Sequence, residues 1–214
     1  MSRRRIIIIV DGPPASGKTT LKAILLEKIG GSSINYKAFG PANLIAKMVL
    51  RFASIVIPSS YDKTRHDPFL LLTPNFWSKL CIVIILLELL YKMLQQLVIL
   101  ALVLLKNVVI IDEFLVLRLA NYINTLKHGI INANALALLC RQDIYFLKYV
   151  STIAYVKYIY IEPSLSMLTK YWQKRGHKVP YNKGFLNLTK YSLKIVKRIV
   201  AKLDSRKISI KIVR

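Results

Sequence analysis

The chain has 214 residues, of which 33 are lysine or arginine and 10 are aspartate or glutamate, and its formal net charge is +23. This length suits one domain with a sizeable core, and the absence of Gly/Ser linkers, repeats and low-complexity tracts excludes a repeat or disordered protein, so we expect a single domain over residues 1–214. The two cysteines show no metal-ligand spacing with the three histidines, which argues against a zinc site and favours buried, reduced thiols in a cytoplasmic protein.

The N-terminal apolar run predicts a buried strand near residues 5–11, and it is too short to indicate a cleavable signal. A phosphate-binding loop pattern follows directly, with four residues between two glycines and then lysine and threonine. The residues that we expect to bind nucleotide are Gly12, Pro13, Pro14, Ala15, Ser16, Gly17, Lys18, Thr19 and Thr20.

The residue types in this loop match the chemistry of a triphosphate. Gly12 and Gly17 let the backbone turn its N–H groups inward, where they can bind phosphate oxygens. Lys18 can reach the β and γ phosphates, and the hydroxyl of Thr19 can ligate Mg²⁺. A helix expected at residues 18–29 adds its N-terminal dipole, so the sequence predicts binding of ATP and Mg²⁺.

Apolar spacing predicts alternating strands and helices along the rest of the chain. Strands are expected near residues 5–11, 34–40, 107–112, 153–162 and 207–213. Helices are expected near residues 18–29, 41–56, 76–105, 115–127, 133–150, 164–175 and 184–203. Together with the phosphate loop, this alternation predicts an α/β chain with the P-loop NTPase fold. We expect a five-stranded, mainly parallel sheet with helices on both faces. The last strand is expected at the edge of the sheet with its lysines outward.

Residues 58–77 are polar, contain prolines and carry aromatic side chains, which suits a loop that recognises the phosphoryl acceptor. Tyr61, Phe76 or Trp77 could stack on a base. Arg65 could pair with a phosphate. An ordinary surface loop has a similar composition, so both interpretations stay open.

Residues 80–105 are strongly apolar and long enough to cross a bilayer. Four polar side chains nevertheless form one stripe along this helix, namely Glu88, Lys92, Gln95 and Gln96. Because such a stripe would be costly inside a bilayer, we expect no membrane span. The helix is instead expected to pack on the sheet or to form a helix-to-helix dimer face.

The β-branched run at residues 107–112 ends in two acids, Asp112 and Glu113, and predicts a buried parallel strand with carboxylates at its C-terminal edge. Ligands of open α/β sheets bind at this edge. Asp112 is therefore placed to hold Mg²⁺ beside Thr19. Glu113 could orient or deprotonate an attacking nucleophile, or it could simply face solvent at the strand end.

Residues 158–178 predict a strand, a turn and a helix that ends at Gly176 among the cations Lys174, Arg175 and Lys178. A cationic segment that closes over a transferring phosphoryl group stabilises its charge and excludes water. Residues 170–184 are thus a candidate lid, with Arg175 as a candidate catalytic residue. The alternative is a helix end that carries cations because of the helix dipole.

Basic residues continue through the C-terminal third, and between Lys190 and Lys202 they recur at helical spacing opposite apolar residues. A solvated helix face explains this pattern, and a basic bias of the source proteome would produce it too. The charge also meets the first criterion for a nucleic-acid partner. Both interpretations stay open.

The order of these features resembles the thymidylate kinase and deoxynucleoside kinase group of P-loop kinases over nearly the whole chain. The stretches that carry the resemblance are residues 12–20, 108–114 and 158–176. The resemblance implies a five-stranded parallel core and Mg²⁺-assisted transfer of the γ-phosphoryl group of ATP to a nucleoside monophosphate or nucleoside. It also implies a homodimer packed through helices, as is frequent in this group.

The departures from the group concern the phosphoryl acceptor. Pro14 stands where thymidylate kinases have an acidic residue that contacts the acceptor sugar, and no arginine follows Asp112 and Glu113 directly. The arginine that would grip the acceptor phosphate is absent between residues 70 and 77, which leaves Arg65 as the nearest substitute.

Three functions fit the sequence. The first is a thymidylate kinase-like, ATP-dependent kinase of a nucleoside monophosphate or nucleoside. The second is a nucleic-acid-directed P-loop ATPase or a kinase of polynucleotide ends that uses the basic surface. The third is a degenerate kinase that binds nucleotide as a structural or regulatory ligand.

Overall fold

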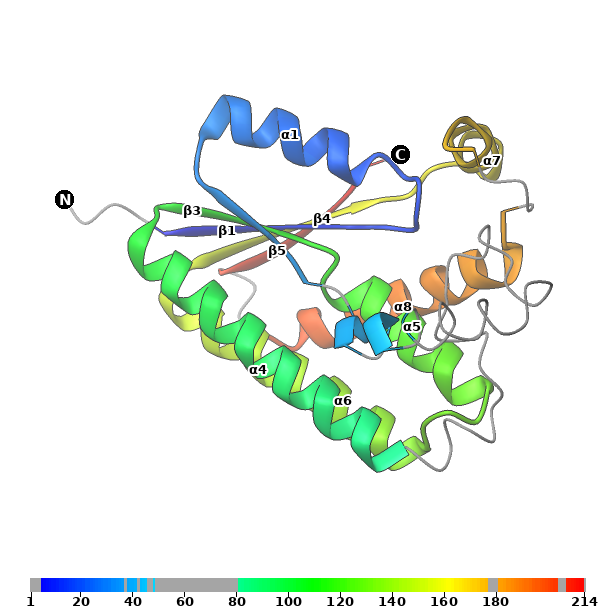
Figure 1. Cartoon of the computed structure of the whole chain (residues 1–214). Helices are drawn as coiled ribbons and strands as arrows, with labels where there is room; N and C mark the ends of the chain where they lie inside the picture. Colours follow the sequence, from blue (N-terminus) through cyan, green and yellow to red (C-terminus); the bar gives the residue numbers. More distant parts are fainter. Residues whose placement is uncertain are drawn as a thin grey trace.

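The computed structural model contains a five-stranded sheet in the order β2-β3-β1-β4-β5, with every neighbouring pair of strands parallel (Figure 1). The strands are β1 (Ile6–Asp11), β2 (Ser32–Asn35), β3 (Val108–Asp112), β4 (Tyr155–Ile161) and β5 (Ile208–Val213). The helices are α1 (Lys18–Ile29), α4 (Cys81–Leu105), α5 (Leu115–Lys127), α6 (Ala133–Ile153), α7 (Leu165–Lys174) and α8 (Lys183–Ala201). The structure describes residues 5–36, 38–41, 43–45, 48, 81–176, 181–203 and 207–213.

The central strand β1 separates two apolar cores because successive side chains of a strand point to opposite faces. Ile8 and Val10 pack under α1, whereas Ile7 and Ile9 join the larger core on the other face. Figure 1 shows α1 on one face of the sheet and α4, α5, α6 and α8 on the other. The predicted α/β fold of the P-loop NTPase type, with helices on both faces, is confirmed, and the sheet is wholly parallel.

The strand predicted at residues 34–40 was misplaced. The strand is β2, which ends at Asn35. The Tyr36 N–H still donates to Asp112 O at 2.8 Å. The chain then turns at Phe39, which has a φ of 51°. The Phe39 N–H donates to a Glu88 carboxylate oxygen and not to a neighbouring strand, so the sheet cannot continue there. The helix predicted at residues 41–56 and the first residues of the one predicted at 76–105 lie largely outside the described residues.

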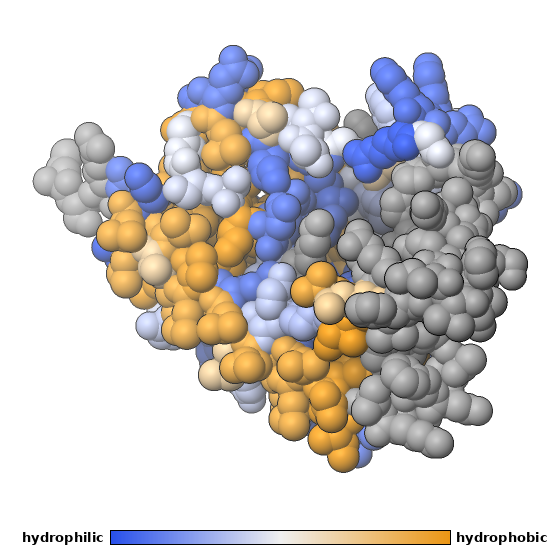
Figure 2. All heavy atoms as spheres, in the orientation of Figure 1, coloured by the Kyte–Doolittle hydropathy of each residue, from blue (hydrophilic) through white to orange (hydrophobic). Residues whose placement is uncertain are grey.

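Helix α4 packs with its polar side toward the protein. Glu88, Lys92 and Gln95 are buried, as an amphipathic helix with a buried stripe requires. The opposite side is apolar and exposed, and Figure 2 shows it as an orange surface over α4. We call this surface the α4 apolar face; it consists of Ile82, Val83, Leu86, Leu90, Met93, Leu94, Leu97, Val98, Leu104 and Leu105.

By length and composition α4 could cross a membrane, and it is the single helix in the described part of the chain that passes this test. Core helices of soluble proteins pass it as well, but they are mostly buried, whereas 28% of the apolar window of α4 is buried. The inward polar stripe has charged partners on α5 and α6, which a spanning helix would have to abandon.

Four buried charges lie between α4, α5 and α6, and we call them the sealed cluster: Glu88, Lys92, Arg118 and Asp143. Lys92 Nζ lies 2.9 Å from Asp143 Oδ2, and Arg118 Nη2 lies 2.9 Å from Glu88 Oε1. The hydroxyls of Tyr36 and Tyr122 donate to Asp143 and Glu88. Two positive and two negative charges thus compensate one another, which is the condition for burying them.

The C-terminal elements follow the sequence prediction. β5 is an edge strand with Ser209 and Lys211 exposed, and α8 buries Val196 while its lysines and arginine face solvent. The prediction of buried thiols was wrong in degree, because Cys81 and Cys140 are half-buried at the border of the small core beneath α4. Partial burial raises the pKa of the Cys140 thiol to about 11.

Candidate functional site

The phosphate loop connects the end of β1 to the start of α1, as the sequence predicted. Gly12 has a φ of 151°, and a Cβ there would lie 2.7 Å from the backbone oxygen of Ile161 at the end of β4. Gly17 has a φ of 90° at the N-cap of α1. Both glycines are therefore required by the backbone, which curls closely against the sheet and presents the N-terminus of α1.

Lys18 lies inside this loop and is almost fully buried. Its ammonium donates to the carbonyl oxygens of Gly12 at 2.9 Å and Pro13 at 3.0 Å, and it lies 3.6 Å from Glu113 Oε1. The positive charge is thus fixed between the loop and the C-terminal edge of the sheet. Phosphate oxygens that enter the loop would meet this ammonium directly.

Glu113 has an unusual backbone for a residue with a side chain. Its φ is 65°, in the left-handed region, while its N–H donates to Val10 O at 3.1 Å. Such a conformation costs free energy in residues other than glycine and tends to occur where function requires it. Here it aims a carboxylate that is a quarter exposed at Lys18. The carboxylate thus faces Lys18, and a role of Glu113 in orienting or deprotonating a nucleophile stays a prediction.

Asp112 ends β3 and lies at the same register as Asn35 of β2 and Val10 of β1. Its Oδ2 pairs with Lys22 Nζ at 3.2 Å, whereas its buried Oδ1 has no hydrogen-bond partner among the described residues. An orphaned carboxylate oxygen at this edge fits a hard cation such as Mg²⁺. Among the described residues, no group of three or more His, Cys, Asp or Glu side chains is arranged so that it could hold a metal ion, so the remaining ligands would come from Thr19, phosphates and water.

Thr19 and Thr20 are exposed in the first turn of α1. The pairing of Thr19 with Asp112 around one ion stays a prediction.

Asp11 is a residue that the sequence interpretation missed. It is completely buried, and its carboxylate accepts from Gly12 N–H, Val116 N–H and the hydroxyl of Tyr158. Burial raises the pKa of this carboxyl above its usual value. Asp11 therefore ties the phosphate loop to the first turn of α5 and to β4. The sequence signal was an acid directly before the first loop glycine.

Helix α7 and the residues that lead into α8 pack against the phosphate loop. Ala15 packs against Leu168 of α7 and against Tyr181, whose hydroxyl donates to Pro14 O at 3.3 Å. Part of the predicted lid, residues 170–184, thus contacts the loop. Arg175 lies at the end of α7 with an exposed side chain, and its catalytic role stays a prediction. The predicted acceptor loop at residues 58–77 lies outside the described residues.

No protein-family model and no curated protein sequence matches this chain. Its structure is similar to that of deoxyadenosine kinase from M. mycoides with the products dCMP and a flexible dCDP bound, with 16% identity, coverage of 96% of this chain and 89% of that chain, and a TM-score of 0.49. The structure of the same kinase with bound dATP is 15% identical, the match covers 95% of this chain and 89% of that chain, and the TM-score is 0.47.

Proposed function

We propose that this chain is an ATP-dependent kinase that transfers the γ-phosphoryl group of ATP to a nucleoside monophosphate or nucleoside, with residues 1–214 as one domain. The observation that carries the proposal is the Lys18 ammonium, which lies between the loop carbonyls and the Glu113 carboxylate. Phosphoryl transfer needs a fixed cation beside the transferring group and a carboxylate beside the nucleophile. This arrangement supplies both within a few ångströms.

On the donor side, the loop N–H groups from Gly12 to Thr19 and the Lys18 ammonium bind the phosphates of ATP. Thr19 and Asp112 would hold Mg²⁺, and this assignment is supported by Asp112 Oδ1, which has no hydrogen-bond partner in the part of the chain that the structure describes. Bound Mg²⁺ would neutralise charge on the β and γ phosphate oxygens. Asp11 keeps the loop in position through the N–H group of Gly12.

On the acceptor side, Glu113 accepts the proton of an acceptor hydroxyl or orients the attacking oxygen. Arg175 and its neighbours close over the transferring group, and the packing of α7 on Ala15 supports this because α7 ends at Arg175. The proposal is thymidylate kinase-like in the donor half. Residues 58–77, with Arg65 and the aromatic side chains, select the acceptor.

Transfer of labelled γ-phosphate from Mg-ATP to a panel of nucleosides, nucleoside monophosphates and 5′-hydroxyl oligonucleotides tests the proposal. We expect a labelled mononucleotide product with the unaltered chain and its loss in Lys18→Ala. Lys28→Ala, which removes the same charge from an exposed position of α1, is the matched control and should retain the activity. Nucleotide binding without any labelled product would instead indicate a degenerate kinase.

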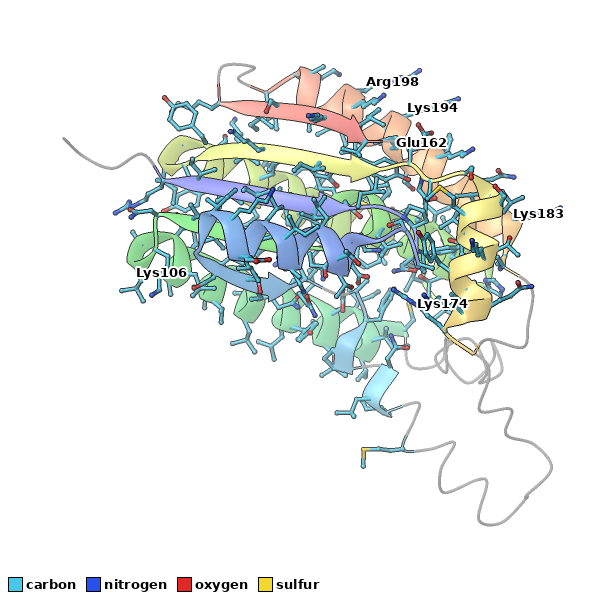
Figure 3. All side chains as sticks on the ribbon, turned by 90° about the horizontal axis from the view of Figure 1, so that it is seen from above. Lys106, Glu162, Lys174, Lys183, Lys194 and Arg198 are labelled. Atoms are coloured by element: carbon cyan, nitrogen blue, oxygen red, sulfur yellow. The ribbon has the colours of Figure 1, made fainter. Side chains whose placement is uncertain are left out.

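A nucleic-acid-directed function is the second candidate, and exposed cations favour it. Figure 3 shows Lys174 at the end of α7 and Lys183, Lys194 and Arg198 along α8. The first turn of α8 adjoins the phosphate loop, because Leu186 shares an apolar cluster with Ala15. A strand bound along these helices would release counterions, so its affinity would fall steeply with salt. Labelled oligonucleotide, or ATP hydrolysis stimulated by nucleic acid, would favour this candidate over the small-molecule kinase.

We also propose that the chain forms a homodimer through the α4 apolar face. Its ten side chains are 49% to 78% exposed, and no charged residue interrupts them on that side of the helix. Covering them would bury roughly 1,000 Å² per chain, which is comparable to one side of a stable protein interface. A second copy fits because a two-fold axis lets one apolar face cover an identical one.

Mass measurement by light scattering tests the dimer. We expect a dimer for the unaltered chain and a monomer for Leu94→Lys, because the lysine places a charge near the middle of the α4 apolar face. Ile24→Lys on α1, where the side chain is 42% exposed, is the matched control and should stay dimeric. A monomeric unaltered chain that binds anionic vesicles would show that a membrane surface covers the face instead.

A further inference from the structure

Lys22 is the second lysine of α1 that faces the sheet edge. It follows Lys18 by four residues, so both ammonium groups leave the same side of the helix one turn apart. Lys18 is directed at Glu113, and Lys22 is directed at Asp112. Two adjacent acids are therefore matched by two lysines, but the two pairs have different surroundings.

The Lys22 ammonium is held by two strands at once. It lies 2.9 Å from Asn35 Oδ1 at the end of β2 and 3.2 Å from Asp112 Oδ2 at the end of β3. Asn35 and Asp112 are register partners, and Gln95 of α4 donates to the backbone oxygen of Asn35 at 3.2 Å. The side chains of Lys22 and Asp112 are 16% and 8% exposed. The Lys22–Asp112 pair is therefore partly buried at the edge of the sheet, with the exposed Asn35 on its outer side.

The ion pair with Lys22 involves one of the two carboxylate oxygens of Asp112. Oδ2 binds Lys22, while the buried Oδ1 has no partner among the described residues. A positive charge beside a carboxylate lowers its attraction for a second cation, and this effect is stronger inside a protein than in water. Phosphates of a nucleotide bring several negative charges and would offset that repulsion.

We propose that Lys22 is a positioning residue that sets the metal affinity of Asp112: its ammonium orients the carboxylate and partly neutralises it, so that a divalent ion binds Oδ1 only together with the phosphates of a nucleotide. This inference rests on the proposed kinase function for its biological role, since it deepens the assignment of Asp112 to Mg²⁺. Because of the Lys22 charge, the divalent ion and the nucleotide bind together, and the site without nucleotide does not retain a divalent ion.

Binding of Mn²⁺ followed by electron paramagnetic resonance tests this without measuring activity. In the absence of nucleotide, Lys22→Gln should bind Mn²⁺ at least about tenfold more tightly than the unaltered chain, because the competing charge is gone. The gain should disappear when Asp112→Asn is added. Lys22→Arg, which keeps the charge, should resemble the unaltered chain.

Lys28→Gln is the control for the general loss of one positive charge from a chain of net charge +23, and it should change Mn²⁺ affinity by less than about twofold. Equal or weaker Mn²⁺ binding by Lys22→Gln would overturn the inference, as would a gain that survives Asp112→Asn. A second titration in the presence of ADP reports on the kinase function separately. Failure to bind nucleotide there would reject the kinase, while the nucleotide-free titration would still decide the role of Lys22.

Discussion

Two groups of acid and base side chains in this molecule are made from the same chemistry and differ in what surrounds them. In the sealed cluster under α4, the ion pairs have side chains at most 3% exposed, and tyrosine hydroxyls supply further hydrogen bonds. At the edge of the sheet, Lys18 and Lys22 face Glu113 and Asp112, whose side chains are 25% and 8% exposed. We call the latter the edge pairs.

The difference lies in the bonding capacity of the carboxylates as much as in burial, because the atom of the sealed cluster without a hydrogen-bond partner among the described residues is Arg118 Nη1, which belongs to the cation and lies 3.8 Å from Asp143 Oδ1. Glu88 uses both carboxylate oxygens, one with Arg118 and Tyr122 and the other with Phe39 N–H. Among the described residues, Asp112 leaves one oxygen without a hydrogen-bond partner, and Lys18 lies on carbonyls that phosphate oxygens could replace. The edge pairs can therefore exchange partners with a ligand, whereas the sealed cluster can only hold α4, α5 and α6 together.

The largest expected effect comes from breaking the sealed cluster. Arg118→Met should lower the free energy of unfolding by about 3–5 kcal/mol, because it leaves Glu88 and Asp143 without their shared cation in a buried place. Denaturant unfolding followed by circular dichroism measures this loss. Lys22→Met at the edge pairs is the comparison and should cost less than about 1 kcal/mol. Equal costs for the two variants would show that the sealed cluster and the edge pairs contribute alike to stability.

Asp11 gives the next largest effect and adds a pH dependence. Asp11→Asn should cost about 1–3 kcal/mol, because an amide cannot accept from all three donors. Burial raises the pKa of Asp11 above 3.8 in the folded chain, so the folded state binds more protons than the unfolded state above that pH. The stability of the unaltered chain should thus fall as pH rises through the folded pKa.

Unfolding titrations between about pH 4 and pH 7 separate these two effects of Asp11. The decrease with pH should be shallower in Asp11→Asn. It should not vanish, because burial also raises the pKa of Glu88 and gives a decrease of the same sign. An equally steep decrease in the variant would mean that Asp11 is ionised in both states over this range.

The sequence predicted that Lys18, Asp112 and Glu113 lie near the phosphate loop and the strand edge, but it predicted no member of the sealed cluster as part of a buried ion pair, because the two groups depend on sequence separation in different ways. The loop lysine, the strand and the two acids are local patterns, so Lys18, Asp112 and Glu113 could be assigned from neighbours in the chain. Arg118 and Asp143 meet Glu88 and Lys92 only after three helices have packed, and nothing near Asp143 in the sequence marks it as buried. Lys22 was overlooked because a lysine on an amphipathic helix ordinarily faces solvent.

The orientation of α4 shows the same limit. Its periodicity predicted a helix with one polar stripe, and the stripe is there, but periodicity alone cannot say which side faces the protein. The partners on α5 and α6 decide that the polar side faces inward. The apolar side is consequently left exposed, which is the basis of the proposed dimer.

Substitutions of Glu113 should have a smaller effect on stability, and they separate backbone strain at this residue from the loss of its charge. Glu113→Gly and Glu113→Ala both remove the carboxylate, so both should lose phosphoryl transfer. Glycine tolerates a φ of 65° and alanine does not, so the glycine variant should be more stable than the alanine variant by about 1 kcal/mol. Thermal unfolding of the two variants measures the difference. The opposite order, which is normal for exposed positions, would show that this backbone relaxes.

The smallest expected effect concerns cations that belong to neither group. Lys194 and Arg198 are exposed on α8 (Figure 3), and replacing both with glutamine should change the free energy of unfolding by less than about 0.5 kcal/mol. Phosphoryl transfer to a mononucleotide should also be unchanged, because these cations lie on the solvated face of the helix. Oligonucleotide binding gives the discriminating measurement: if α8 contacts a strand, the slope of log affinity against log salt should become shallower by up to about 2, roughly one for each lost phosphate contact. An unchanged slope would assign these charges to solvation, and the edge pairs would then be the part of the basic chain whose charge acts on a ligand.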